Sequence, residues 1–448
     1  MTAPARTAAF QALRAVGAEQ ADLPAALSRT RSHLIDERDR ALAADIVTGT
    51  LRWQRSLDHL IEHFARRPLS KLDADVVLIL RLSLYQILHL DRVPASAVVD
   101  DAVDMTRGAR KTSAAGFVNA VLRSTLRHRS RLPLPARPSD PADRAAAIAY
   151  LSVTHSHPEW LVARWLDRHG LDAAERWVRF DNDAPPLALR ANRLRLTRDD
   201  LRAALAQDGV ETEPARYAPD GLIVTAGNPL RRPLDGSFVV QDEASQLVPL
   251  MVGARPGDRV LDLCASPGGK TTAMAAAMGD TGVVVASDVR RRRVTLLRDT
   301  VRASGARHVH VVQVGAKGPL PFRDGFDRVL VDAPCSGLGT IRRDPDIRWR
   351  RSEADLEPLA REQRTLLARA AEVVGPGGRL VYATCSSEPE ENDIVVESFL
   401  REHPDFALVD ARGELPRLSP LLDARGMLRT LPFAHGVEAF FAAAFRRT

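Results

Sequence analysis

From Gly236 onward, short apolar runs alternate with helical patterns, and this alternation is the strongest constraint on the fold. It predicts a parallel, doubly wound α/β sheet whose ligands bind at the carboxyl ends of the strands. The five runs expected to be parallel strands are 259–264, 283–287, 309–314, 328–332 and 379–384. A sixth run at 439–445, rich in Phe, is expected to be antiparallel at the sheet's end.

All three cysteines of the chain lie at the ends of predicted strands. Cys264, Cys335 and Cys385 each follow an apolar run, next to Asp, Pro, Ser or Gly. Because strand ends of a parallel sheet meet at one edge, we expect the thiols to point toward one crevice. A free cysteine is often only a small buried hydrophobe. Three such positions nevertheless favour a chemical role for at least one thiol.

The remainder of the chain reads as two further domains. The first ~130 residues show helical spacing of apolar residues, and 76–90 is apolar all round, as in the central helix of a bundle. A Pro-rich linker at 131–138 ends this part. A mixed segment then shows a helix opening at Pro158, a helix at 197–207 and short strands at 187–191 and 222–224. The predicted domains are 1–135 (helical), 140–235 (small α+β) and 236–448 (doubly wound α/β).

The net charge of +6 lies entirely in the first 140 residues, which hold 21 basic and 15 acidic side chains. Between 105 and 139 there are eight basic residues and no acidic one. Such one-sided charge is typical of nucleic-acid binding, although a solvated helix face is the alternative. The basic residues of this stretch are Arg107, Arg110, Lys111, Arg123, Arg127, Arg129, Arg131 and Arg137.

Composition favours a cytoplasmic protein. Three cysteines are too few for a disulfide framework. Arg6, Gln11 and Arg14 interrupt any secretory signal, and Arg81 and Gln86 interrupt the most apolar stretch, which is too short to span a membrane. We expect a monomer with no metal and no membrane partner.

A glycine-rich turn follows the first predicted strand, with a helix expected from about Thr271. A P-loop would need glycine where Cys264 stands, and the G-x-G-x-x-G fingerprint is missing. Asp288 lies twenty residues after Gly268, a spacing that suits a ribose contact. The turn therefore predicts a nucleoside cofactor, and S-adenosylmethionine fits; glycine for packing alone is the alternative. The expected cofactor contacts are Cys264, Ala265, Ser266, Pro267, Gly268, Gly269, Lys270, Asp288 and Asp332.

Three motifs, 262–272, 332–337 and 382–392, together resemble the RsmB/NOP2/Sun family of RNA cytosine-C5 methyltransferases. Its marks are Pro-Cys-Ser and Thr-Cys-Ser at neighbouring strand ends, and 340–349 is similar to the stretch that follows the first of them. Residues 116–123 resemble a NusB-type RNA-binding domain, and 156–160 open a segment similar to the family's RRM-like domain. The resemblance implies an all-α NusB-like bundle, a small α+β RRM-like domain and a Rossmann-like class I methyltransferase domain that uses S-adenosylmethionine.

The resemblance also implies roles for individual residues. Cys385 would add to C6 of cytosine as the nucleophile, Cys335 would assist proton removal and product release, and Asp332 would place the base. Arg342 and Arg343, with Arg348, Arg350 and Arg351 behind them, would contact RNA phosphates or form a solvated loop. Lys270 would stabilise the turn or the cofactor's carboxylate, and Cys264 would pack beside it. The bacterial members with this three-part layout act on 16S ribosomal RNA, the expected partner; transfer RNA stays open.

One departure and two rival classes remain. The family usually carries an acidic residue after the third strand, whereas 314–318 contains none, which leaves open what replaces that cofactor contact. A non-catalytic RNA-binding factor would account for the basic helical part but not for the cysteine motifs. An oxidoreductase with a cysteine pair would predict a C-x-x-C motif, which the sequence lacks.

Overall fold

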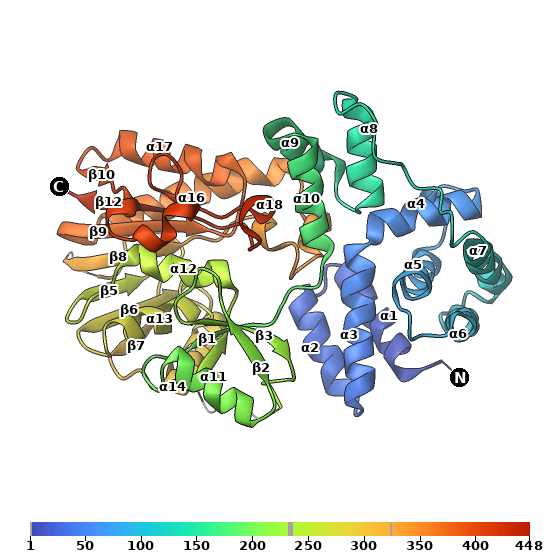
Figure 1. Ribbon diagram of the computed structural model, residues 1–448, viewed down its shortest axis with the longest axis horizontal. Helices are drawn as coiled ribbons and strands as arrows, with labels where there is room; N and C mark the ends of the chain where they lie inside the picture. The colour runs from blue at the N-terminus through green and yellow to red at the C-terminus, as the bar shows by residue number, and fades with distance from the viewer. Residues whose placement is uncertain (1, 232–235, 323–324) are drawn as a thin grey trace. The chain divides into compact units, whose positions relative to one another are not determined.

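The computed structural model describes residues 2–231, 236–322 and 325–448 (Figure 1). The chain forms two compact units, Met1–Ala184 with Ile341–Glu353, and Pro185–Thr340 with Ala354–Thr448. We call them the helical unit and the sheet unit. The cut at 184/185 falls inside the segment 140–235, so the three-domain division stays a prediction. None of the described helices is long and apolar enough to cross a membrane.

The helical unit is built around α5 (Ala74–His89), in the place predicted for a central helix. Its apolar side chains are buried on nearly all sides, and it packs against α1, α3, α4, α6 and α7. Asp22, Asp36 and Asp73 cap the helices that they precede by accepting backbone N–H bonds. The surrounding helices are α1 (Pro4–Gly17), α2 (Leu23–His33), α3 (Glu37–Arg52), α4 (Gln54–Ala65), α6 (Ala95–Gly108) and α7 (Ala115–Arg127).

Three further helices complete the helical unit, α8 (Arg144–Ala149), α9 (Glu159–His169) and α10 (Leu171–Asn182). Pro158 precedes α9, as predicted. Trp165 of α9 stacks on Trp177 of α10 with ring centroids 4.3 Å apart, and both side chains are fully buried. This stacked aromatic pair packs α9 against α10.

The segment Ile341–Glu353, with the short helix α15 (Ile347–Arg350), packs inside the helical unit. Arg348 is fully buried and donates hydrogen bonds to the carbonyls of Arg52, Ser156 and Asp181 and to Oδ1 of Asn182. The prediction that Arg348 is solvated or contacts phosphates is therefore wrong, because its donors are used internally.

A small antiparallel sheet of order β2-β3-β1-β4 begins the sheet unit. The helix α11 (Arg198–Gln207) packs on it and starts at a capping box between Thr197 and Asp200, where the sequence predicted its start. The strands are β1 (Ala188–Ala191), β2 (Glu211–Pro214), β3 (Gly221–Ala226) and β4 (Phe238–Val240).

The main sheet has the order β10-β12-β9-β8-β5-β6-β7, and the two-residue β11 pairs with β12. The five predicted central strands are confirmed, and they pair in parallel. From β5 the chain runs outward to β6 and β7 and returns to β8 on the other side, so the topological switch point lies between β5 and β8. The strands are β5 (Arg259–Asp262), β6 (Val283–Asp288), β7 (Val309–Gln313), β8 (Phe326–Asp332), β9 (Val374–Thr384), β10 (Phe406–Leu408), β11 (Leu428–Arg429) and β12 (Phe441–Arg447).

The final strand is antiparallel, as predicted, but its predicted place at the sheet's end is wrong. β12 pairs with β9 on one side and with β10 on the other. It is therefore an interior strand, and this explains the complete burial of Phe441 and Phe445.

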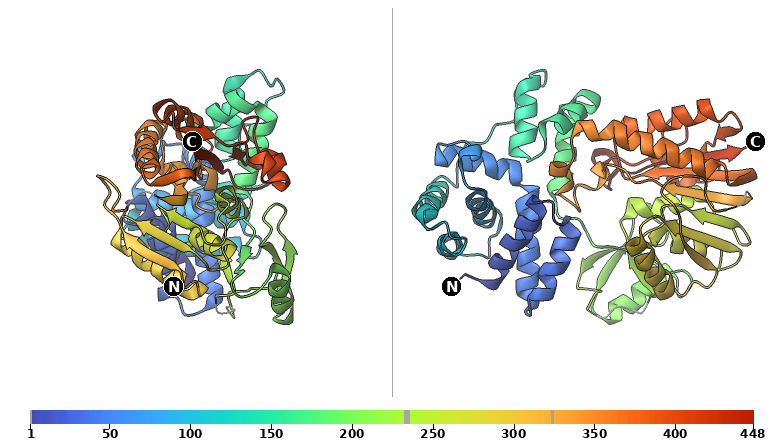
Figure 2. Two further views of the ribbon diagram at one scale, coloured as in Figure 1. Left: turned by 90° about the vertical axis from the view of Figure 1, so that its left-hand side faces the viewer. Right: turned by 180° about the vertical axis from the view of Figure 1, so that it is seen from behind.

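Helices cover both faces of the main sheet (Figures 1 and 2). Successive residues of each strand alternate between two apolar cores, so that Val260 and Leu330 face one while Leu261 and Val329 face the other. The helices are α12 (Glu243–Val252), α13 (Gly269–Ala277), α14 (Arg291–Ser304), α16 (Leu356–Ala371), α17 (Asp393–Glu402) and the short α18 (Pro432–His435).

We predict that Arg348→Met lowers the free energy of unfolding by about 3 kcal/mol, because four buried acceptors lose their donor. Urea denaturation measures the change. Arg350→Met is the matched control on the same short helix; Arg350 is exposed and pairs with Asp346 at 3.1 Å, so its loss should cost under about 1 kcal/mol. Equal effects of the two substitutions would contradict the anchoring role of Arg348.

Candidate active site

The two motif cysteines meet at the carboxyl ends of β8 and β9. These strands pair in parallel with Asp332 opposite Ala383. The backbone N–H of Ala333 donates to the carbonyl of Ala383 at 2.8 Å, which continues the pairing past the end of β8. The Sγ atoms of Cys335 and Cys385 lie 3.3 Å apart, within sulfur hydrogen-bonding distance. The expectation of a shared crevice therefore holds for these two thiols.

The Cys335 thiol is held in its neutral form. The hydrogen bond with Cys385 and burial raise the pKa of Cys335 well above its ordinary value, and the charge of Glu391 adds to the shift. A thiol with a raised pKa is a poor nucleophile at neutral pH but a competent proton carrier.

Lys270 and Asp332 form a charged pair beside the cysteines. The Lys270 ammonium donates to Oδ2 of Asp332 at 2.6 Å, and Lys270 is close enough to Cys385 for their charges to interact. Burial acts to lower the pKa of Lys270, but the charge of Asp332 more than offsets it, so that the pKa is raised. Lys270 therefore stays a cation, and in this structure it binds Asp332.

The glycine turn links β5 to α13, which begins at Gly269, two residues before the predicted start. Gly268 has φ +111°, and a Cβ there would lie 3.0 Å from Cδ1 of Leu297, so this position needs glycine. Arg190 of β1 donates to the carbonyl of Gly269 at 2.9 Å and to Oγ1 of Thr272 at 2.8 Å. The small sheet thus supports the turn from outside.

A cavity of about 310 Å³ opens beside this turn. It combines a helix N-terminus, a cation–carboxylate pair and a buried Gln241 Oε1 that has no hydrogen-bond partner within the described chain. These features fit a small polar ligand with a nucleoside part. The cavity is lined by Val239, Val240, Gln241, Ser245, Ala265, Ser266, Pro267, Gly269, Lys270, Thr300 and Asp332.

Three predicted cofactor residues lie outside the lining of this cavity. Cys264 packs against the core, and burial raises the pKa of its thiol, with Asp332, Asp262 and Asp288 adding to the shift. Gly268 packs against α14. The carboxylate of Asp288 accepts the backbone N–H of Arg290 at 3.1 Å at the end of β6.

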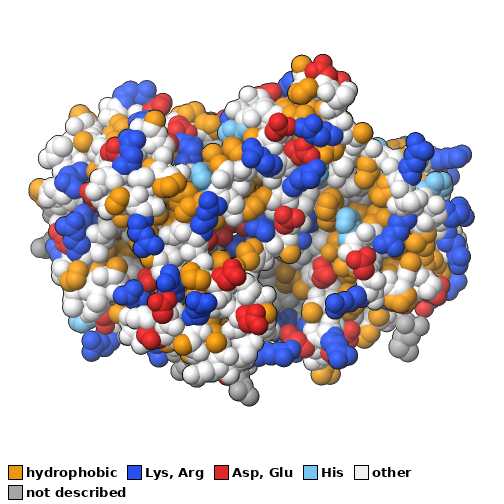
Figure 3. All heavy atoms as spheres, in the orientation of Figure 1, with side chains coloured by type: hydrophobic (Ala, Val, Ile, Leu, Met, Phe, Trp, Pro, Cys, Tyr) orange, Lys and Arg blue, Asp and Glu red, His pale blue; other side chains and the backbone are white. Residues whose placement is uncertain are grey.

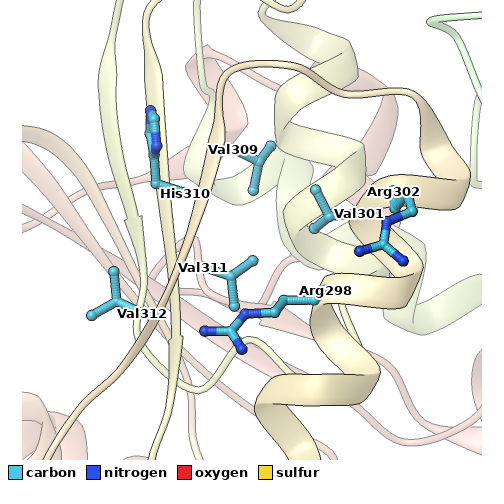
Figure 4. A pocket seen from close by; sticks show the side chains of 7 residues that line it. All are labelled: Arg298, Val301, Arg302, Val309, His310, Val311 and Val312. Carbon is cyan, nitrogen blue, oxygen red and sulfur yellow. The ribbon is translucent and has the colours of Figure 1, made fainter.

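Another pocket, of about 530 Å³, lies along the edge strand β7 and α14 (Figure 4). In Figure 4, Val309 and Val311 face the helix that carries Arg298 and Val301. It contains no cysteine and none of the predicted site residues. The cavity at the glycine turn is therefore the better candidate, because six of the nine predicted cofactor residues line it, among them the paired Lys270 and Asp332.

Sequence reasoning missed several residues of this site. Gln241 lies between the end of β4 and the helix cap Asp242, a polar position that could have been noticed. Glu391 lies inside the third motif, but nothing local in the sequence indicates its burial. The stretch 314–318 follows β7 and carries no carboxylate. Arg369 of α16 holds it in place by donating to the carbonyls of Gly315 and Ala316, each at 3.1 Å.

Some of the predicted RNA-contacting side chains are exposed, and others contact another part of the chain. Arg107, Arg110, Arg123 and Arg127 are exposed, and Figure 3 shows basic side chains along the edge of the helical unit where α7 lies. Lys111 instead pairs with Asp73 at 2.5 Å. Arg343 is half-buried. Arg342 lies over the ring of Phe180 and donates to the carbonyls of Asp183 and Ala184, all inside the helical unit.

Comparison with protein families matches the whole layout. The family described as 16S rRNA methyltransferase RsmB/F matches residues 249–446, the NusB family matches 3–127, and the RsmF/B-like ferredoxin-like domain matches 157–231. The predicted fold classes are thereby confirmed, with the RRM-like part described as ferredoxin-like.

Individual relatives agree. The probable ribosomal RNA small subunit methyltransferase B of Bacillus subtilis is 34% identical over 93% of this chain and 92% of its own length. Ribosomal RNA small subunit methyltransferase B of Pseudomonas putida is 35% identical over 91% of this chain and 92% of its own length.

Solved structures agree as well. The crystal structure of PH0851 matches all of this chain and 99% of its own chain, with a TM-score of 0.81 at 26% identity. A methyltransferase homologue from Pyrococcus horikoshii, 27% identical, covers 67% of this chain and 99% of its own with a TM-score of 0.58. The chain belongs to the RsmB/F family of S-adenosylmethionine-dependent 16S rRNA methyltransferases.

Proposed function

We propose that this protein methylates C5 of a cytosine in 16S rRNA through a covalent bond between Cys385 and C6 of the base. The observation that carries the proposal is the pair of thiols 3.3 Å apart at neighbouring strand ends, next to the cofactor cavity. Nucleophilic attack on the base requires only one thiol. A second, protonated thiol at this distance from the first is suited to proton transfer.

The chemistry needs a nucleophile because C5 of cytosine is too weakly nucleophilic to take a methyl group directly. Addition of the Cys385 thiolate to C6 makes C5 the nucleophilic carbon of an enamine. S-adenosylmethionine, bound at the glycine turn, supplies the electrophilic methyl group. Loss of the C5 proton then breaks the Cys385–C6 bond and restores the aromatic ring.

The remaining residues have supporting roles in this proposal. Ala265, Ser266, Pro267, Gly269, Lys270 and Gln241 hold the cofactor, and Asp332 hydrogen-bonds the base. Cys335 gives its proton to the Cys385 sulfur as that sulfur leaves C6, and the Cys335 thiolate formed in this way accepts the proton that leaves C5. The target base has to be splayed out of any helix to reach the site.

RNA delivery is assigned to the helical part. The exposed residues Arg107, Arg110, Arg123 and Arg127 would contact phosphates and orient the RNA without reading its sequence. The boundaries 1–135, 140–235 and 236–448 are proposed as three parts with separate tasks: RNA binding, support of the glycine turn, and catalysis.

The substrate is tested by incubating the protein with labelled S-adenosylmethionine and either 16S rRNA or tRNA, followed by bisulfite mapping. One methylcytosine in 16S rRNA is the expected product. Methylation confined to tRNA would overturn the substrate, and methylation of another base or atom would overturn the proposed reaction.

We predict that Cys385→Ala lowers methyl transfer at least about 1,000-fold, because the covalent step is lost. Turnover is measured with the labelled donor. The variant should still bind S-adenosylmethionine, which serves as its folding control. Substantial residual turnover would exclude Cys385 as the nucleophile.

Cys335→Ala should behave differently, because it removes the proton carrier and leaves the nucleophile. We expect a protein–RNA adduct that survives denaturing gel electrophoresis and accumulates relative to wild type. Normal turnover without adduct would contradict the release role of Cys335. The double variant with Cys385→Ala should form no adduct.

Gly268→Val tests the turn. A side chain at φ +111° that meets Leu297 should displace the backbone and weaken S-adenosylmethionine binding at least about tenfold. Isothermal titration calorimetry measures the affinity. The control is Gly279→Val, which has φ +61°, is exposed and has open space at its Cβ, so it carries backbone strain without touching the cavity. Equal loss in both variants would assign the effect to strain alone.

A further inference from the structure

Glu391 is a fully buried carboxylate in the 3-10 turn η6 (Pro389–Glu391), at the N-terminal side of α17. Its Oε1 accepts the backbone N–H of Ser336 at 2.8 Å and Nε2 of Gln363 at 2.9 Å. Its Oε2 accepts the hydroxyls of Ser336 and Ser386, each at 2.5 Å. All four donors are neutral, so the negative charge of the carboxylate is solvated but not cancelled.

Two of these donors belong to the loops that carry the thiols. Ser336 directly follows Cys335, and Ser386 directly follows Cys385. The same carboxylate therefore bridges the ends of β8 and β9 one residue beyond the cysteines. Gln363 of α16 adds a bond from its Nε2 to the carbonyl of Pro334 at 3.0 Å, and the Tyr382 hydroxyl donates to the Glu391 carbonyl at 2.5 Å. The bridge is thus fixed from a helix and a strand.

We propose that Glu391 is a positioning residue that holds the two cysteine loops at their working separation and sets a negative charge beside the Cys335 thiol. This inference deepens the proposed function and rests on it for the meaning of the two thiols. Burying a carboxylate among neutral donors is costly, and such an arrangement is typical of a site where the charge acts on a neighbouring group.

The charges around Cys335 are consistent with this role. Among the described residues, the ionisable groups that act on Cys335 include Tyr382 of β9, Cys385 directly after β9, and Glu391 of η6. Lys270 and Asp332 lie beside Cys385, and Arg364 of α16 acts on Tyr382. The charge of Glu391 adds to the rise in the pKa of Cys335, after the hydrogen bond with Cys385 and burial.

The test measures alkylation of each thiol by iodoacetamide against pH in RNA-free protein. Trypsin cleavage after Arg328 and Arg342, and after Arg379 and Arg401, places Cys335 and Cys385 on separate peptides for mass spectrometry. In Glu391→Gln the midpoint for Cys335 should fall, because a neighbouring negative charge is removed. Cys264 is the internal reference and should not change.

The same variant should lose methyl transfer at least about tenfold in kcat with a nearly unchanged KM for RNA, because loop spacing affects chemistry rather than binding. Glu391→Asp keeps the charge but shortens the bridge; it should retain the Cys335 midpoint and lose turnover. Glu397→Gln, on the exposed face of α17, is the matched control and should change neither quantity.

If Glu391→Gln does not fold, the double variant Ser336→Ala with Ser386→Ala removes the hydroxyl donors and leaves the charge. It should lose turnover and keep the Cys335 midpoint. A wild-type midpoint in Glu391→Gln, or wild-type turnover in any variant that breaks the bridge, overturns the inference. The alkylation requires no RNA, so it decides the role of Glu391 even if methylation of C5 is disproved.

Discussion

The parallel pairing of β8 with β9 is the constraint on which the active site depends. Its register sets Asp332 opposite Ala383, and from there each chain needs only a few residues to bring its cysteine to the same point. A shift of one residue in a strand would turn its side chains to the other face of the sheet. The two apolar cores that alternate along β8 and β9 fix that register, so packing on both faces determines the distance between two sulfur atoms.

Around this pairing, buried charge is arranged asymmetrically. Lys270 and Asp332 form a pair on the side of the cofactor cavity, whereas Glu391 lies behind the cysteine loops among neutral donors. The charge of Lys270 therefore interacts with Cys385, whereas the charge of Glu391 acts on Cys335, although the two cysteines are alike in sequence context. Asp262, at the end of β5, is another buried carboxylate with a neutral donor. Burial raises its pKa to about 7, and the Thr271 hydroxyl donates to its Oδ2 at 2.7 Å.

The helical unit is stabilised by an apolar core together with a buried polar side chain. Its centre is the apolar helix α5, but the segment Ile341–Glu353 is fixed by the polar side chain of Arg348, whose two terminal nitrogens donate to carbonyl and amide oxygens. An arginine can fill this role because its planar group donates in several directions at once.

The sequence by itself determined the class of the fold, the parallel strands and their order along the chain, the glycine turn and the two cysteine motifs that follow neighbouring strands. These follow from local periodicity, turn chemistry and short motifs, which depend on neighbours in sequence. Only the tertiary structure decided that β12 is an interior strand, that Arg348 is buried and that Glu391 joins the two cysteine loops. Each of these depends on side chains that are distant in sequence and meet only after packing, where burial changes an ordinary charged residue into a structural or electrostatic one.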